Sequence, residues 1–262
     1  MSRESGSGEQ AVHQSEVELG RFYIPNTVVP SDAAPREASD GATLPGLVLI
    51  HDVFGLSDHS QALATDLAAE GFGVLEIDLY RRLGPVVVED PGEQIRSLSD
   101  PEVLADLDLG ADWVQNQPRC AGRKVGIVGV CMGGTYSILA ACLSDRFSAA
   151  APFYGILSYD KGMLFDADGR DAQKKPYSPI EAAGQLRTPM LASFGAEDAF
   201  VPNEDVDALR DALAPSGVFA DLDRYVGAGH AFLNRTRPAA FHEDASNHAW
   251  ARIIPFLRER LA

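Results

Sequence analysis

The residues with the clearest chemical potential are a cysteine between two glycines, Gly129-Val-Cys131-Met-Gly133, at the end of an apolar run. The spacing Gly-x-Cys-x-Gly is typical of a sharp strand-to-helix turn that exposes a nucleophile. The flanking residues must be small because such a turn brings backbone segments close together and strains the central residue. Cys131 could also be a small buried residue beside packing glycines, so this pattern alone leaves a catalytic and a structural interpretation open.

A cysteine at this turn would lie at the N-terminus of the next helix. There the helix dipole and the free N–H groups favour a thiolate and can bind an oxyanion. The backbone N–H of Met132 is the expected first oxyanion donor. Cys120 and Cys142 have no such setting, and we interpret both as structural. Three cysteines without regular spacing argue against a disulfide framework and favour a reducing compartment.

A nucleophile at such a turn requires an acid and then a histidine, each in a loop after a later strand. The chain provides Asp198 in Gly195-Ala-Glu-Asp, and then His230 in Gly-Ala-Gly-His. His230 would take the thiol proton and later protonate the leaving group, while Asp198 would orient the imidazole. Glu197 is a neighbouring alternative acid, but Asp198 fits the Gly-x-x-Asp spacing better. The order Cys131, Asp198, His230 therefore predicts a catalytic triad.

The elements that would position these residues follow a regular order. From residue 47 onward, apolar strands alternate with helical patterns, which is typical of a doubly wound, mostly parallel α/β sheet with helices on both faces. An edge strand is expected earlier, at residues 17–24. The later strands are expected at residues 47–50, 73–77, 124–129, 148–153, 189–194 and 219–226, and the helices at 60–70, 101–116, 133–143, 203–214 and 239–261.

The remaining segments are polar or irregular. Residues 1–16 are predicted to form a disordered tail, and residues 17–262 a single α/β domain. Residues 82–99 and residues 156–187 lack helical or strand periodicity. Each of these two segments could form a lid over the site or an ordinary surface loop.

Composition and charge exclude several functions. The 262-residue chain has a formal net charge of −16, so nucleic acid and anionic membrane surfaces are poor partners. No stretch reaches the roughly 18–20 apolar residues of a membrane span, and the polar N-terminus lacks a signal-peptide core, so a cytoplasmic protein is expected. Zinc-ligand spacing and a dinucleotide-binding glycine motif are absent, so no metal and no organic cofactor is predicted. We expect a monomer or small homo-oligomer with a small-molecule substrate.

Six stretches, read in order, resemble the dienelactone hydrolase family, a cysteine-nucleophile branch of the α/β-hydrolase fold. The resemblance covers roughly residues 45 to 238. It implies hydrolysis of a lactone or carboxylic ester, such as the enol-lactone carboxymethylenebutenolide, through a thioester intermediate. The family triad falls on Cys131, Asp198 and His230. The matching stretches are LVLIHDVFGL, EIDLYRR, GIVGVCMGGTYSILAA, AAPFYG, LASFGAEDAFVP and AGHAFLNRTRP.

The resemblance also implies roles for the loop after the first buried strand. Family members read Glu-x-(Phe/Trp)-Gly there, with the glutamate against the resting thiol and the next N–H completing the oxyanion hole. This chain reads Asp52-Val53-Phe54-Gly55, so Asp52 takes the glutamate position and Val53 supplies the second donor. Aspartate is one methylene shorter, so Asp52 could act on the thiol or only fix the loop. We interpret His51 as a strand-end residue that could reach the pocket rim.

Substrate-binding residues are less well specified. Phe54 and Tyr80 could line the pocket. Family members that act on dienelactone hold its carboxylate with arginines, one of them four residues after the catalytic histidine, where this chain has Asn234. A guanidinium suits this task because it binds a carboxylate through two parallel hydrogen bonds. The arginines that could serve here are Arg81, Arg82, Arg96 and Arg235.

Two further interpretations stay open. One keeps the triad in a general carboxylesterase or thioesterase without preference for lactone acids. The other is a non-catalytic protein of the same fold that binds a small ligand or senses oxidants through Cys131, because an exposed, acidic thiol is readily oxidised.

Overall fold

The computed structural model describes residues 12–25, 27–28, 36–37, 43–84 and 86–262. Its strands are β1 (Val12–Val17), β2 (Gly20–Pro25), β3 (Thr27–Val28), β4 (Arg36–Glu37), β5 (Gly46–Ile50), β6 (Gly73–Ile77), β7 (Val125–Val130), β8 (Ala149–Phe153), β9 (Met190–Gly195) and β10 (Ala220–Tyr225). Its helices are α1 (Asp58–Ala69), α2 (Pro91–Ser97), α3 (Asp100–Gln115), α4 (Met132–Leu143), α5 (Pro179–Ala182), α6 (Asn203–Leu213) and α7 (Glu243–Leu261).

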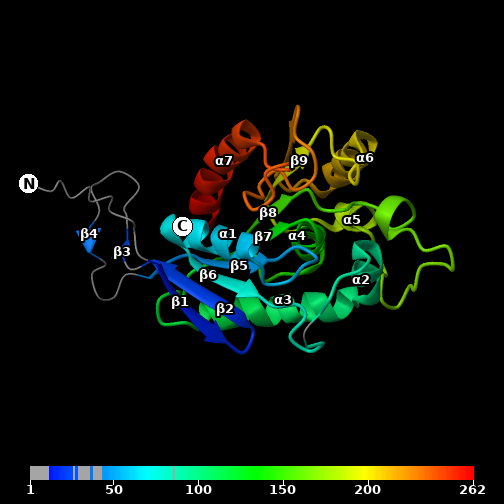
Figure 1. Cartoon of the computed structure of the whole chain (residues 1–262). Coiled ribbons are helices and arrows are strands. Elements are labelled where there is room, and N and C mark those ends of the chain that lie inside the picture. The colour runs from blue at the N-terminus through cyan, green and yellow to red at the C-terminus, as the bar shows by residue number, and fades with distance from the viewer. Residues whose placement is uncertain (1–11, 26, 29–35, 38–42, 85) are drawn as a thin grey trace, which may run out of the picture.

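The centre of the molecule is an eight-stranded sheet with the order β1-β2-β6-β5-β7-β8-β9-β10 (Figure 1). The six strands from β6 to β10 in this order are parallel, and the β1–β2 hairpin joins them through an antiparallel pairing of β2 with β6. This is the doubly wound, mostly parallel arrangement expected from the sequence. The carboxyl ends of the parallel strands therefore lie along one edge of the sheet, where ligands bind in such folds.

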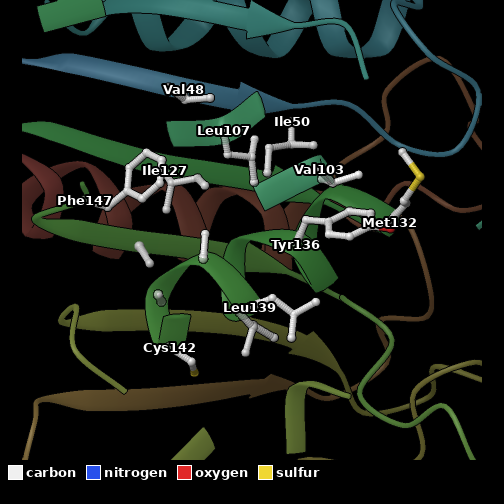
Figure 2. Close-up of a cluster of buried hydrophobic side chains, with 14 of the residues drawn as sticks. Val48, Ile50, Val103, Leu107, Ile127, Met132, Tyr136, Leu139, Cys142 and Phe147 are labelled. Atoms are coloured by element: carbon white, nitrogen blue, oxygen red, sulfur yellow. The ribbon is translucent and has the colours of Figure 1, made fainter. Parts of the chain in front are cut away.

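Both faces of the sheet are covered by helices because its parallel strands are apolar on both sides. In β5, Val48 and Ile50 face a core that includes α3, α4 and α6, whereas Leu47 and Leu49 face a second core with α1 and α7. Figure 2 shows part of the first core, to which α4 contributes Tyr136 and Leu139 and α3 contributes Val103 and Leu107. All five residues of β5 are buried, as they are in β6 and β8.

The N-terminal region differs from expectation. The edge strand predicted at residues 17–24 corresponds to β2, which is not at the edge because β1 pairs along its outer side, and residues 12–16, predicted as part of a tail, belong to β1. The remainder of that tail, residues 1–11, lies outside the described residues. The strand Val-His-Gln-Ser-Glu-Val carries few apolar side chains because backbone pairing to β2, rather than burial, holds it in the sheet.

Residues 82–99 were also expected to be irregular, but they contain α2. The helix is only seven residues long, so hydrophobic periodicity cannot reveal it. Its start is nevertheless encoded locally. Asp90 caps the helix by accepting the Glu93 N–H at 3.0 Å, and Pro91 occupies the first turn. The last helix begins at Glu243 rather than at residue 239, with the ring of His242 as its cap.

The segment 156–187 is anchored by a buried polar cluster that we call the Lys175 cluster, made of Lys175, Asp100, Tyr136 and Tyr159. Lys175 Nζ lies 2.6 Å from an oxygen of Asp100 and 3.0 Å from the hydroxyl of Tyr136. The hydroxyl of Tyr159 donates to the other oxygen of Asp100 at 2.9 Å. Burial lowers the pKa of Lys175 and raises the pKa of Asp100. The cluster ties this segment to α3 and α4.

Within the part of the chain that the structure describes, none of the helices has the length and apolar character needed to cross a membrane.

Candidate active site

Cys131 stands between β7 and α4 in the strained turn that its sequence predicts. Its backbone has φ 55° and ψ −117°, a conformation that non-glycine residues rarely adopt. Two hydrogen bonds hold it there: the Cys131 N–H donates to the carbonyl of Phe153, and the Thr135 N–H donates to the carbonyl of Cys131, both at 3.1 Å. The side chain is half-buried at the N-terminus of α4.

The two glycines of the motif are required by close backbone approach. A Cβ atom at Gly129 would lie 2.1 Å from the carbonyl oxygen of Gly133. A Cβ atom at Gly133 would lie 2.3 Å from the carbonyl oxygen of Ile50, at the end of β5. Both distances are too short for any side chain, so only glycine fits either position. The turn is thus pressed directly against the strand that carries the next functional loop.

Cys120 and Cys142 lie in a different environment. Both are buried in the first core, with Cys120 beside Gly73 of β6 and Cys142 on α4 (Figure 2). Burial raises the pKa of each thiol to about 12. Neither thiol is therefore set up to be a nucleophile near neutral pH.

Asp198 and His230 meet in the loops that follow β9 and β10. The distance from His230 Nδ1 to Asp198 Oδ2 is 2.8 Å. The other oxygen of Asp198 accepts the N–H groups of Phe200 at 2.8 Å and Val201 at 3.2 Å. The carboxylate is buried and both of its oxygens have hydrogen-bond partners, so its orientation toward the imidazole is fixed. Glu197, the alternative acid, makes no such contact with the imidazole among the described residues.

His230 is electrostatically adapted to carry a proton. Burial opposes protonation, but hydrogen bonds to Asp198 and to the thiol of Cys131, with the charges of both groups, raise its pKa to about 10. The rings of Tyr154 and Phe200 pack edge-on against the imidazole, each with centroids 5.1 Å away. The imidazole therefore binds the carboxylate inside an aromatic frame, with Cys131 close enough to raise its pKa. This geometry suits transfer of the thiol proton to nitrogen.

The loop after β5 places Asp52 and Val53 beside this site. The carboxylate of Asp52 accepts the Phe54 N–H at 2.9 Å, which closes the turn. This contact favours the loop-fixing role for Asp52. Among the described residues, neither the Val53 N–H nor the Met132 N–H donates to a protein acceptor. Two unpaired N–H groups next to a nucleophile are what an oxyanion hole requires.

The predicted pocket aromatics divide into two kinds. Tyr80 is buried, and its hydroxyl donates to the carbonyl of Val53 at 2.8 Å and lies 3.5 Å from the sulfur of Met132. Burial raises its pKa well above the ordinary value. Tyr80 thus supports the loop after β5 through the carbonyl of Val53. Phe54, by contrast, is 50% exposed and lies at the mouth of the site.

The arginines considered from the sequence are engaged by other groups. Arg81 binds both oxygens of Asp106 at 2.7 and 2.6 Å, and Arg235 binds Asp66 of α1 at 2.8 Å. The structure therefore does not bring Arg81 or Arg235 to the thiol as free guanidinium groups. The alternatives are also occupied: Arg82 binds Asp106, and Arg96 binds the carbonyl of Met163.

Sequence reasoning missed Arg237. Its guanidinium lies 5.5 Å from the ring of Phe54 and lines a cavity of about 360 Å³ beside Asp52. It comes seven residues after His230 rather than four. Successive turns bring it back, because the Asn234 N–H donates to the carbonyl of Ala231 and the Arg237 N–H to that of Asn234. The sequence signal for these turns is limited to polar residues such as Asn234, a type that favours turns.

No group of three or more His, Cys, Asp or Glu side chains within the described ranges is arranged to hold a metal ion.

Comparison with known proteins places this geometry in context. The model of the dienelactone hydrolase family matches residues 33–261. A candidate carboxymethylenebutenolidase of Salmonella typhimurium is 30% identical over 241 residues, which cover 88% of this chain and 83% of the relative. A candidate 2-oxo-3-(5-oxofuran-2-ylidene)propanoate lactonase of Bradyrhizobium is 28% identical over 83% of this chain and 85% of that protein. The crystal structure of a candidate dienelactone hydrolase from Klebsiella pneumoniae is 26% identical with a TM-score of 0.78, covering 96% and 99% of the two chains.

Proposed function

The chain belongs to the dienelactone hydrolase family and is a hydrolase of esters or lactones, and from this premise we propose that it acts through Cys131, His230 and Asp198. Its substrate in this proposal is a lactone or ester that carries a carboxylate. The observation that carries the proposal is the position of His230. Its imidazole contacts Asp198 at 2.8 Å and is close enough to Cys131, in the strained turn, for that group to raise its pKa.

The first half of the reaction forms a thioester. The Cys131 proton resides on His230, and the thiolate attacks the carbonyl carbon of the substrate. The carbonyl π electrons move to oxygen, and the N–H groups of Val53 and Met132 bind the resulting oxyanion. When the tetrahedral intermediate collapses, the carbon–oxygen bond to the leaving group breaks. His230 donates its proton to the departing oxygen, which in a lactone remains tethered to the acyl group.

The second half releases the acid. Water attacks the thioester carbonyl while the neutral imidazole of His230 accepts a proton from it. The second tetrahedral intermediate collapses with cleavage of the carbon–sulfur bond, so the thiolate of Cys131 leaves. Asp198 keeps the imidazole in one orientation and stabilises its positive charge in both halves. No atom or electron from a cofactor enters this scheme.

The substrate carboxylate is proposed to bind at Arg237. The name of the Bradyrhizobium relative describes a lactone with a propanoate group, and the name of the Salmonella relative describes one with a carboxymethylene group. Arg237 has no ion-pair partner among the described residues and lines the cavity beside Asp52. Phe54 provides an apolar surface next to it. A planar unsaturated lactone acid matches this combination of guanidinium and aromatic ring.

The test is hydrolysis of a dienelactone, a neutral lactone, p-nitrophenyl acetate and an acyl thioester by the wild type and Cys131→Ala. We expect turnover of the anionic lactone that Cys131→Ala reduces by at least about a thousandfold. Mass spectrometry of the quenched wild type should show an acyl group on the Cys131 peptide. Thiol-dependent turnover of neutral esters alone would favour a general carboxylesterase or thioesterase. Turnover that survives in Cys131→Ala would refute the thioester mechanism.

A further inference from the structure

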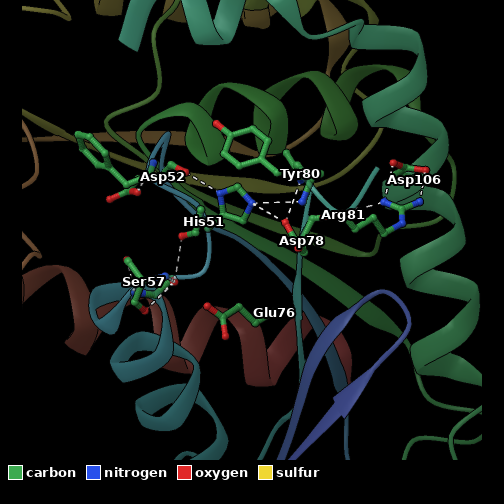
Figure 3. A network of polar contacts seen from close by, with 12 residues as sticks. His51, Asp52, Ser57, Glu76, Asp78, Tyr80, Arg81 and Asp106 are labelled. Atoms are coloured by element: carbon green, nitrogen blue, oxygen red, sulfur yellow. Dashed lines mark hydrogen bonds and ion pairs between the residues drawn. The ribbon is translucent and has the colours of Figure 1, made fainter. Parts of the chain in front are cut away.

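His51 directly follows β5 and precedes residues 52–55, which we call the oxyanion loop, and its imidazole is completely buried. Figure 3 shows the ring between that loop and the segment that follows β6. Its Nδ1 lies 2.5 Å from the carbonyl oxygen of Asp52, and its Nε2 lies 3.1 Å from the backbone nitrogen of Leu79. A carbonyl can only accept and a backbone N–H can only donate. The ring therefore carries its proton on Nδ1 and is neutral.

The contact with Asp52 fixes the peptide that supplies an oxyanion donor. The Asp52 carbonyl and the Val53 N–H belong to one planar, trans peptide unit, so they point in opposite directions. When the imidazole holds the carbonyl, the N–H is turned to the side away from the ring. The Gly55 N–H donates to the same carbonyl at 3.2 Å, so both lone pairs of that oxygen are occupied. Reversal of this peptide would break both hydrogen bonds.

The next peptide unit is held as well. Its carbonyl, from Val53, accepts the hydroxyl of Tyr80, and its N–H, from Phe54, donates to the carboxylate of Asp52. The rings of His51 and Tyr80 lie 5.1 Å apart (Figure 3). Tyr80 contacts the loop from the segment that follows β6, whereas His51 directly precedes the loop. Both peptide units that flank the Val53 α-carbon are therefore clamped by side chains outside the reaction centre.

The surroundings favour the neutral ring. Burial lowers the pKa of His51, although the nearby carboxylates of Asp52, Asp78 and Glu76 oppose that effect. The Asp78 carboxylate is 3.9 Å from Nε2, but it is already engaged by the Tyr80 N–H at 2.8 Å. A proton on Nε2 would face the Leu79 N–H, which has no other acceptor among the described residues. Protonation would thus remove a hydrogen bond and leave two donors opposed.

We propose that His51 is a positioning residue that holds the Val53 N–H in place for the oxyanion through its Nδ1–H bond to the Asp52 carbonyl. This inference rests on the proposed function, because it needs an oxyanion next to Cys131. It assigns His51 no contact with substrate and no proton transfer. The prediction is specific to one ring nitrogen, which makes it separable from a general packing role.

Three substitutions separate the two nitrogens. In His51→Asn, the amide nitrogen can occupy the place of Nδ1 and donate to the Asp52 carbonyl. In His51→Gln, the amide lies near the place of Nε2, so it can accept from Leu79 but loses the bond to Asp52. His51→Phe keeps the ring shape and loses both bonds. We expect acylation by p-nitrophenyl acetate to fall about 10- to 100-fold in Gln and Phe, and less than about threefold in Asn.

Alkylation of Cys131 by iodoacetamide provides the second readout. This displacement occurs at a saturated carbon and develops no oxyanion, so it reports only on the thiol and His230. We expect every His51 variant to stay within about twofold of the wild-type alkylation rate. Parallel losses of acylation and alkylation would overturn the assignment, as would wild-type acylation in His51→Gln. If His51→Gln does not fold, His51→Asn decides: a loss beyond tenfold would overturn it.

The same experiment distinguishes failure of the proposed function. Turnover that survives Cys131→Ala would remove the thioester mechanism and the oxyanion role of His51 with it. A wild type that is acylated and alkylated at Cys131, with no difference between His51→Asn and His51→Gln, would refute only the assignment of His51.

Discussion

Two buried carboxylates each bind a basic side chain near α4, one pair at the start of the helix and the other farther along it. Only the first pair lies next to a cysteine thiol that could react. Asp198 binds His230, whose pKa is also raised by Cys131 at the start of the helix. Asp100 holds Lys175, which contacts the hydroxyl of Tyr136 one turn farther along. The pKa of His230 is raised to about 10, whereas burial lowers the pKa of Lys175.

The difference shows that a buried ion pair does not by itself identify an active site. Asp198 is saturated by two backbone N–H groups, so its remaining capacity is directed at one nitrogen of His230. The other nitrogen is left for the thiol. In the Lys175 cluster, both oxygens of Asp100 and the Lys175 amine are satisfied internally, with no nucleophile in contact. The first pair is suited to moving a proton and the second to joining three segments.

Loss of the first pair should abolish catalysis without unfolding the protein. Asp198→Asn leaves the shape of the site intact but favours the wrong imidazole tautomer, so kcat is expected to fall roughly a thousandfold or more. Steady-state hydrolysis and thermal unfolding, measured on the same preparation, check this. Glu197→Gln is the matched control and should change kcat less than about twofold. A Glu197→Gln variant as inactive as Asp198→Asn would mean that the acid of the triad is misassigned.

Loss of the second pair should do the reverse. Lys175→Met leaves the Asp100 carboxylate buried without its cation, which is expected to lower the free energy of unfolding by about 3–5 kcal/mol. The kcat/KM of the folded variant should stay within about threefold of the wild type. Urea unfolding and hydrolysis at low temperature measure the two quantities.

The matched control for that variant is the exposed ion pair of Arg187 and Asp145, whose nearest charged atoms lie 2.8 Å apart. Asp145→Asn is expected to cost less than about 1 kcal/mol, because water screens exposed pairs. A Lys175→Met variant that is fully stable would contradict the anchoring role of the cluster. One that is folded but inactive would place the cluster in the catalytic machinery.

The pH dependence of unfolding tests the first pair in another way. The pKa of His230 is raised in the folded state, from 6.5 to about 10. Its contribution to stability is therefore fully present below about pH 6.5 and is lost as the pH rises through about 10. The stability difference between wild type and His230→Gln, followed by urea unfolding from pH 6 to 10.5, should narrow across this window. A difference that widens with pH would show that His230 is neutral in the folded protein.

The smallest expected effect distinguishes Arg237, which has no ion-pair partner among the described residues, from Arg235, which is paired with Asp66. Arg237→Gln should raise KM for an anionic lactone about tenfold and leave KM for p-nitrophenyl acetate within about twofold. Arg235→Gln, two residues earlier and paired with Asp66, should change neither value appreciably. Equal effects of Arg237→Gln on the charged and the neutral substrate would argue against a carboxylate site at this position.

Much of the fold could be predicted because its strands are short, continuous apolar runs. The expected strand at residues 47–50 corresponds to β5, and the Gly-x-Cys-x-Gly spacing places the turn between β7 and α4. The hairpin strand β1 was missed because backbone pairing, not burial, specifies it. Helix α2 was missed because seven residues are too few for a periodic pattern.

The surroundings of the site were less predictable because their contacts join distant parts of the chain. Lys175 looks like a surface residue in a polar segment, and only its contact with Asp100, 75 positions away, explains its burial. Arg237 depends on two successive turns, and the role of His51 depends on the backbone of Leu79. Spacing rules could name the proposed nucleophile, acid and base, but not the groups that contact them from distant parts of the chain.

The contact between Gly133 and the end of β5 has a further consequence. At this point the backbone of the turn that carries Cys131 lies directly against the backbone at the end of β5, with no space for a side chain between them. The spacing between the thiol and the proposed oxyanion donor at Val53 is therefore set by direct backbone contact. We expect core substitutions that shift α1, α3 or α7 to leave this backbone contact unchanged. Such a contact would let the sequence of the rest of the molecule change while the distance between the Cys131 turn and the end of β5 stays constant.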